Sequence, residues 1–164
     1  MILQSLGGAE RKMLTDLCAY LKNWFDEDEF HRKLPRWEQE FTITDGKIDL
    51  SGKILDGQMF RIYGSMLNDG VYIYNEDLTL IDETFTGLIQ SMRTEPDFIK
   101  LVNDINEWLS KYGTATSTAM SPFNSESFGG YSYSKAGNGT GGSDGAGASP
   151  YSVFGARMAR WKKI

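Results

Sequence analysis

The sequence predicts an α+β fold, in which a small helical body carries an inserted antiparallel β-sheet or partial barrel and an extended C-terminal arm that ends in a short helix. Three observations lead to this fold class. Apolar residues recur at helical spacing over residues 9–25 and 96–112, they alternate over residues 40–92, and a glycine-rich segment follows. We therefore expect a folded body over residues 1–120 and an arm over residues 121–164.

The first helix is expected over residues 9–25, because the apolar residues there follow the spacing of an amphipathic helix. They are Met13, Leu14, Leu17, Cys18, Leu21, Trp24 and Phe25. Cys18 is the single cysteine, so no internal disulfide can form, and its place in the apolar stripe predicts a buried thiol. An acidic run at residues 26–29 ends the stripe.

Five short strands are expected between residues 40 and 92, separated by turn sequences such as Asp45-Gly46 and Asn68-Asp69-Gly70. They cover residues 41–43, 48–50, 59–63, 71–74 and 84–92. Frequent turns between short strands are typical of a small antiparallel sheet or a partly closed barrel. A second amphipathic helix over residues 96–112 would cover this sheet, with Pro96 in its first turn and Gly113 at its end.

The C-terminal part differs from the body in both glycine content and charge. Residues 129–147 contain 8 glycines, which predicts a flexible linker, and Pro150 then precedes a short amphipathic helix that ends in basic residues. Residues 1–120 hold 12 basic and 20 acidic side chains, whereas residues 121–164 hold 5 and 2. The acidic body and the basic arm can therefore attract each other, within one chain or between neighbours.

No catalytic, cofactor or metal site is expected. The spacing Gly-x-Gly-x-x-Gly that begins at Gly137 lacks the strand and helix of a dinucleotide site. His31, the only histidine, stands beside two basic residues, which favours an exposed position, and the acidic run at 26–29 lacks the pattern of a calcium loop. An enzyme would have to use carboxylates such as Asp82 and Glu83, and no spacing marks a catalytic pair.

No signal peptide and no apolar run of membrane-spanning length is recognised, so we expect a cytoplasmic chain without membrane contact. Aromatic residues among the strands leave a second function open. Phe60, Tyr63, Tyr72 and Tyr74 fit either core packing or a base-stacking surface. The alternative function is thus a small nucleic-acid-binding or regulatory module built on the five-stranded sheet, although the acidic excess opposes phosphate binding.

Two parts of the arm have the composition of contact surfaces. The segment SESFGGYSYSK places aromatic residues among serines and glycines, so it could add to a neighbour's sheet edge or fold as a strand on its own subunit. In the terminal helix, Trp161 with Arg157 and Arg160 has the composition of an interface anchor, the alternative being a disordered basic terminus.

Several longer stretches occur in one order along the chain, namely LTDLCAYLKNWFD, DGQMFRIYGSMLNDGVYIY followed by DETFTGLIQSM, SPFNSESFGGYSYSK and VFGARMARWKKI. In this order they resemble the head-tail connector, or adaptor, proteins of tailed bacteriophages and prophages. The resemblance implies a structural virion protein with no enzymatic activity. It would form a ring, expected to be a dodecamer, under the portal and link the DNA-filled head to the tail.

The partners implied by the resemblance are the portal protein, identical subunits in the ring, and the next connector or tail-terminator protein. DNA would pass through the channel without specific binding. The protein would reside in the virion and, during assembly, in the host cytoplasm. The strand-rich insertion and the long glycine tract depart from a minimal helical adaptor, which leaves open what the insertion contacts.

The resemblance also assigns the contacts with the portal or a neighbouring subunit to the C-terminal extension. The residues concerned are Ser125, Glu126, Ser127, Phe128, Tyr131, Tyr133, Tyr151, Phe154, Arg157, Met158, Arg160, Trp161, Lys162 and Lys163.

Overall fold

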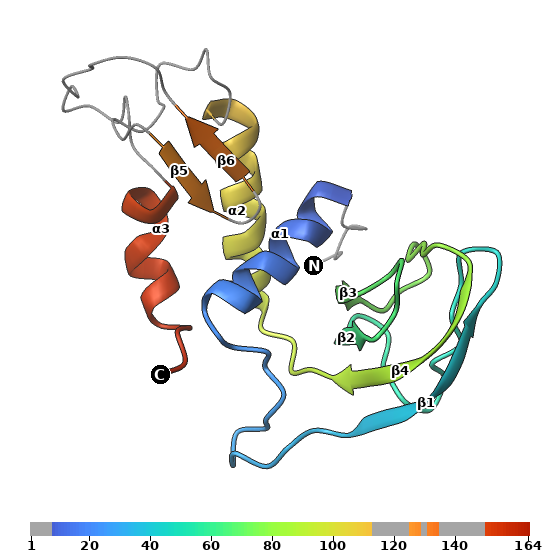
Figure 1. Cartoon of the computed structure of the whole chain (residues 1–164). Helices are drawn as coiled ribbons and strands as arrows, with labels where there is room; N and C mark the ends of the chain where they lie inside the picture. The colour runs from blue at the N-terminus through green and yellow to red at the C-terminus, as the bar shows by residue number, and fades with distance from the viewer. Residues whose placement is uncertain (1–7, 113–124, 129–130, 135–149) are drawn as a thin grey trace, which may run out of the picture. The chain divides into compact units, whose positions relative to one another are not determined.

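A computed structural model of the chain describes residues 8–112, 125–128, 131–134 and 150–164. The described residues fall into two compact units (Figure 1). The first unit contains residues up to 15 and residues 24–95, and the second contains residues 16–23 and the described residues from 96 onward. The presence of helices together with an antiparallel sheet confirms the α+β class.

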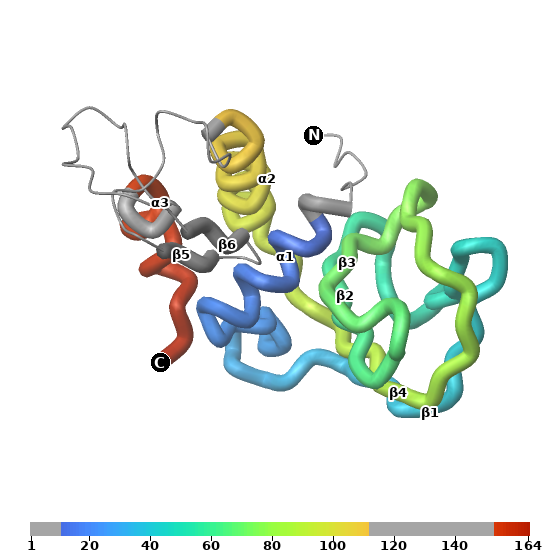
Figure 2. Tube along the Cα trace, turned by 45° about the horizontal axis from the view of Figure 1, so that its top comes forward, coloured from blue at the N-terminus to red at the C-terminus, as the bar shows by residue number. Residues whose placement is uncertain are grey.

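The first unit is built on a four-stranded antiparallel sheet in the order β1-β4-β2-β3. The strands are β1 (Arg36–Ile43), β2 (Met59–Tyr63), β3 (Gly70–Ile73) and β4 (Glu83–Ser91). Strand β4 pairs with β1 on one side and with β2 on the other, so β1 and β3 form the two edges (Figures 1 and 2).

The prediction of a five-stranded sheet is wrong, because residues 48–50 form no strand. The Asp45-Gly46 turn does form, with positive φ at both residues, and Thr44 and Lys47 exchange two backbone hydrogen bonds of 3.0 Å across it. Pairing then stops. The Leu50 carbonyl accepts the N–H groups of the residues three and four positions later, which turns the chain away from β1.

The apolar residues of this departing segment fill the core instead of extending the sheet. The core covers one face of the sheet and consists of Phe41, Ile43, Ile48, Leu50, Ile54, Phe60, Ile62, Leu78, Leu80, Phe85 and Ile89. Five of these come from the loops that follow β1 and β3, namely Ile48, Leu50, Ile54, Leu78 and Leu80. The side chains of these two loops therefore bury the face of the sheet that a fifth strand and a packed helix would bury in a larger domain.

Helix α1 (Gly8–Tyr20) stops short of the predicted end at Phe25. Lys22 takes the left-handed conformation with φ 53°, and the Asn23 N–H donates to the carbonyl of Cys18. A second bond runs from the Lys22 N–H to the carbonyl three residues before it. This pair of bonds is a Schellman motif, which satisfies the last helical carbonyls and ends the helix.

The second unit contains α2 (Pro96–Tyr112), as predicted, together with α3 (Pro150–Ala159) and the hairpin of β5 (Ser125–Phe128) and β6 (Tyr131–Ser134). Its buried apolar residues are Leu17, Cys18, Leu21, Phe98, Ile99, Leu101, Val102, Ile105, Phe154 and Met158. Burial of Cys18 confirms the predicted structural thiol. Within the predicted glycine linker at residues 129–147, residues 131–134 form β6 instead of flexible chain, and the other positions lie outside the described residues.

Candidate assembly surfaces

Helix α3 carries several of the predicted contact residues, and it packs on α2. Phe154 and Met158 are buried, and the ring of Phe154 meets that of Trp108 edge to face, with 6.4 Å between centroids. These two side chains therefore lie in the interior of the second unit. The predicted contact residues of α3 and the chain end that lie at the surface are Arg157, Arg160, Lys162 and Lys163.

Two ion pairs join α3 to α2. Arg157 lies 2.8 Å from the Asp104 carboxylate, and Arg160 lies 3.7 Å from that of Asp97. Asp104 also accepts a hydrogen bond from Lys100 at 3.0 Å. Partial burial by itself would raise the pKa of Asp104, but the hydrogen bonds from Lys100 and Arg157 hold this pKa below its usual range. Asp104 is therefore a charged anchor for α3 near neutral pH.

Trp161 and the residues after it are held by the end of α1. The Asn23 amide donates to the Trp161 carbonyl at 2.8 Å, and the Lys163 N–H donates to the Leu21 carbonyl at 3.0 Å. The Trp161 ring is half-buried and stands edge to face against Phe98, with 5.7 Å between centroids. The end of the chain is thus a packed element of the second unit.

The other predicted contact residues lie in the β5–β6 hairpin or at the start of α3. The two strands pair in register from Ser125 opposite Ser134 to Phe128 opposite Tyr131. Glu126, Ser127 and Tyr133 fall within this pairing. The side chains of the hairpin and of Tyr151 lie outside the described part of the chain. The predicted docking role of these residues therefore stays a prediction.

A network of buried polar groups holds the loop between β2 and β3, at residues 64–69. The Ser65 hydroxyl donates to the Glu83 carboxylate and accepts the Asn68 N–H at 2.7 Å. The Asn68 side chain, only 2% exposed, bonds both backbone groups of Ile81, donating to the carbonyl at 2.9 Å and accepting the N–H at 2.8 Å. A loop whose buried groups are satisfied in this way has one well-defined conformation.

Glu83, at the start of β4, is the anion of this network. The hydrogen bond from Ser65, followed by those from the Met66 N–H and the Asn68 amide, holds the pKa of the Glu83 carboxyl below its usual range. Hydrogen bonds to a carboxylate favour its charged form. The loop therefore favours the ionised form of Glu83.

The same loop exposes large apolar side chains. We call the set Tyr63, Met66, Leu67 and Ile81 the apolar tip. Met66 is 93% exposed, and the other three are more than half exposed. Neighbouring apolar side chains displayed on a well-ordered loop are a feature of interaction surfaces. Sequence reasoning treated this segment only as a turn, although the pair Met66-Leu67 inside a Gly- and Asn-rich turn was a signal that large apolar groups lie away from the core.

The strand aromatics do not form a common stacking surface. Phe60 is fully buried and packs against Tyr72 and Tyr74, with centroids 5.7 and 6.1 Å away. Tyr63 is exposed, and the Arg61 guanidinium lies 5.2 Å from the centroid of its ring. Core packing therefore accounts for Phe60, Tyr72 and Tyr74, three of the four aromatic residues for which the sequence allowed either core packing or base stacking.

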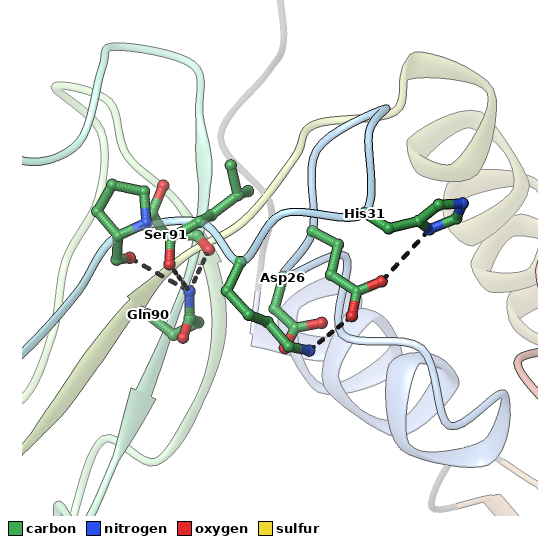
Figure 3. A network of polar contacts seen from close by, with 8 residues as sticks. Asp26, His31, Gln90 and Ser91 are labelled. Atoms are coloured by element: carbon green, nitrogen blue, oxygen red, sulfur yellow. Dashed lines mark hydrogen bonds and ion pairs between the residues drawn. The ribbon is translucent and has the colours of Figure 1, made fainter.

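Three of the four carboxylates of the acidic run after α1 form ion pairs within their own loop, and Figure 3 shows the contacts around Asp26 and His31. Lys33 lies 2.8 Å from the carboxylates of both Asp26 and Glu27, and His31 lies 3.7 Å from Glu27. The His31 side chain is exposed, as predicted. A backbone hydrogen bond from Arg32 is the main cause that lowers the pKa of Asp28. Within the described ranges, no group of three or more His, Cys, Asp or Glu side chains could hold a metal ion.

The comparisons with known proteins leave the resemblance untested. A scan against protein-family models, a search of curated proteins and a search of solved structures each found no match. In the part of the chain that the structure describes, no helix combines the length and the apolar character that crossing a membrane requires.

Proposed function

We propose that this chain is a subunit of the head-tail connector of a tailed bacteriophage or prophage. It would form a ring under the portal, bind the next connector or tail component on the opposite side, and let DNA pass without binding it specifically. The role is structural, without catalysis, and places the protein in the virion. The order of sequence motifs that resembles the connector family is the basis of this proposal.

The observation that carries the proposal is the apolar tip. The stretch DGQMFRIYGSMLNDGVYIY, one of those that carry the resemblance, folds as β2, the loop and β3, and the loop is held by Asn68 and Glu83. These hydrogen-bonded polar groups stabilise a loop that displays Met66 and Leu67 to solvent. Such an arrangement would supply a preformed contact for a ring that repeats one interface many times.

The surface charge of the two regions supports distinct roles. The acidic excess of residues 1–120 would repel the phosphates of DNA that passes along a channel. At the other end of the chain, Arg160, Lys162 and Lys163 are exposed beside the packed Trp161. Among the described C-terminal residues, these exposed basic side chains form the surface that would bind an acidic or polar site on the portal.

The test is the mass of the full-length protein, measured alone and after mixing with portal particles of the same phage. We expect a ring on the portal. Replacing the tip with Met66→Ser and Leu67→Ser should weaken ring formation without loss of stability, because both side chains are exposed. Leu55→Ser is the matched control, since Leu55 is 75% exposed and lies outside the tip.

A protein that stays monomeric with portal particles and retains duplex DNA at moderate salt would contradict the proposal. That result would favour the nucleic-acid-binding alternative, whose affinity should fall steeply as salt rises. Equal effects of the tip and control substitutions would show that the tip is not the ring contact.

A further inference from the structure

The outer edge of β1 has unpaired main-chain groups. The Ser91 N–H donates to the Pro35 carbonyl at 3.0 Å, which makes Pro35 and Ser91 a hydrogen-bonded pair in the β1–β4 register. Bonding alternates along an antiparallel pair, so the odd-numbered residues of β1 bond to β4. The N–H and C=O groups of Arg36, Glu38 and Glu40 therefore point away from the sheet, and they have no hydrogen bond within the described chain.

This edge is open because the segment after the turn departs from it. Among the described residues, the bridge between Thr44 and Lys47 is the one pairing on this side of β1. Beyond it, the Leu50 N–H bonds the Tyr74 hydroxyl at 3.3 Å and Ile48 enters the core. No described strand therefore occupies the position beside β1 where the sequence predicted a fifth strand.

The edge is also held in place from β4, as Figure 3 shows. The Gln90 amide donates to the carbonyls of Leu34 and Pro35, both at 3.2 Å, and to that of Ser91 at 2.8 Å. These bonds fix the start of β1 against the sheet. A strand that is already extended and fixed loses little entropy when another strand pairs with it.

The side chains beside the open groups are acidic and unpaired. Glu38 faces Leu88 and Glu40 faces Thr86 across the β1–β4 register, so β4 offers neither carboxylate a cation. Both carboxylates lack an ion-pair partner among the described residues. Arg36 is the one basic residue of the strand. An added strand would place its own side chains directly beside these carboxylates.

A second copy of the chain fits this edge poorly. The antiparallel register that pairs residues 36–42 with the same residues of a second copy would set Glu38 opposite Glu40 twice. Like charges directly opposite each other on a sheet are destabilising. The charges therefore oppose self-pairing and favour a basic partner.

We propose that the outer edge of β1 binds an extended segment of a partner protein that carries Lys or Arg at alternate positions. The basic side chains pair with Glu38 and Glu40, and the residues on either side of this pair are apolar because they lie beside Trp37 and Phe41 on the core side. Main-chain bonds supply affinity and the alternating side chains supply register. This inference does not depend on the connector function.

The test uses the full chain and a capped peptide of alternating Lys and Val, with a capped peptide of alternating Glu and Val as its control. We expect the Lys peptide to bind and to slow hydrogen exchange at the Glu38 and Glu40 amides. In the Glu38→Lys, Glu40→Lys variant, the Lys peptide should bind about tenfold more weakly or worse, and the Glu peptide should bind instead.

The matched control is the Glu76→Lys, Asp77→Lys variant, which changes the net charge equally at exposed sites away from β1. It should bind the Lys peptide as the wild type does. Equal loss in both variants, or binding without protection of the Glu38 amide, would overturn the proposal in favour of non-specific charge attraction. Protection that rises with protein concentration in the absence of peptide would overturn it in favour of a second copy.

Discussion

The two edge strands of the sheet, β3 and β1, differ in how their outward-facing main-chain groups are hydrogen-bonded. At the β3 edge, the Val71 N–H donates to the Thr15 hydroxyl of α1 at 2.9 Å, and Val71 is fully buried. At the β1 edge, Glu38 and Glu40 have open main-chain groups and exposed side chains. One main-chain donor of the short edge is thus satisfied by α1, whereas the long edge carries open main-chain groups beside charged side chains. Charged side chains along an edge strand oppose its pairing with another copy of the same strand.

The largest effect should come from proline at neighbouring positions of β1. Gln39→Pro removes a hydrogen bond to Gly87 of β4 and should cost about 3 kcal/mol or more. Glu38→Pro should cost about 1 kcal/mol or less, because its N–H points outward and proline is tolerated on that side of an edge strand. Urea unfolding of the two variants measures the difference. Equal losses would show that the hydrogen-bonding alternation along β1 is misassigned.

A smaller difference in the free energy of unfolding is expected between substitutions of two threonines, one at each edge of the sheet. Thr15→Val leaves the buried Val71 N–H without its acceptor and should cost about 1–3 kcal/mol, and Thr15→Ser should recover most of this. Thr42→Val removes only an exposed contact of 3.1 Å with Thr84 and should change the free energy of unfolding by about 0.5 kcal/mol or less. Thermal unfolding of the three variants is the measurement. A larger loss for Thr42→Val would reverse the comparison of the edges.

The smallest effect on stability is expected from the protonation of Glu83 at low pH. Glu83 lies opposite Ile43 of β1, and its carboxylate accepts hydrogen bonds from the loop before β3. Its pKa is lowered in the folded state from the ordinary value of 4.5, so its contribution to stability is complete above pH 4.5 and is lost as pH falls through the folded-state pKa. The stability difference between wild type and Glu83→Gln should therefore narrow as the solution is acidified below pH 4.5. Urea unfolding across this range measures it, and a constant difference would exclude an ionised Glu83 in the loop.

The sequence predicted correctly those helices and strands in which the apolar spacing and the residues that mark the two ends indicate the same bounds. Helix α2 begins at Pro96 and ends at Tyr112 as predicted, because its apolar stripe is regular and Gly113 follows it. Strand β2 also has its predicted bounds, Met59–Tyr63. Both elements are specified by residues close together in the chain.

The sequence could not predict features that depend on contacts between distant residues. Alternation at 48–50 is equally compatible with a paired strand and with two core residues, and the Tyr74 hydroxyl decides between them. The end of α1 depends on Lys22 in a left-handed conformation that is usually taken by glycine. An ion pair that joins α3 to α2 is made by Asp104, which sequence reasoning did not connect with Arg157. The connector role itself stays a prediction from resemblance.

Hydrogen exchange of the free full-length protein tests the open edge most directly. We expect fast exchange at the amides of Arg36, Glu38 and Glu40 and slow exchange at Gln39 of the same strand. Val71 at the β3 edge should also exchange slowly. Uniform slow exchange along β1 in dilute, monomeric protein would show that the edge is already covered and would contradict an open β1 edge.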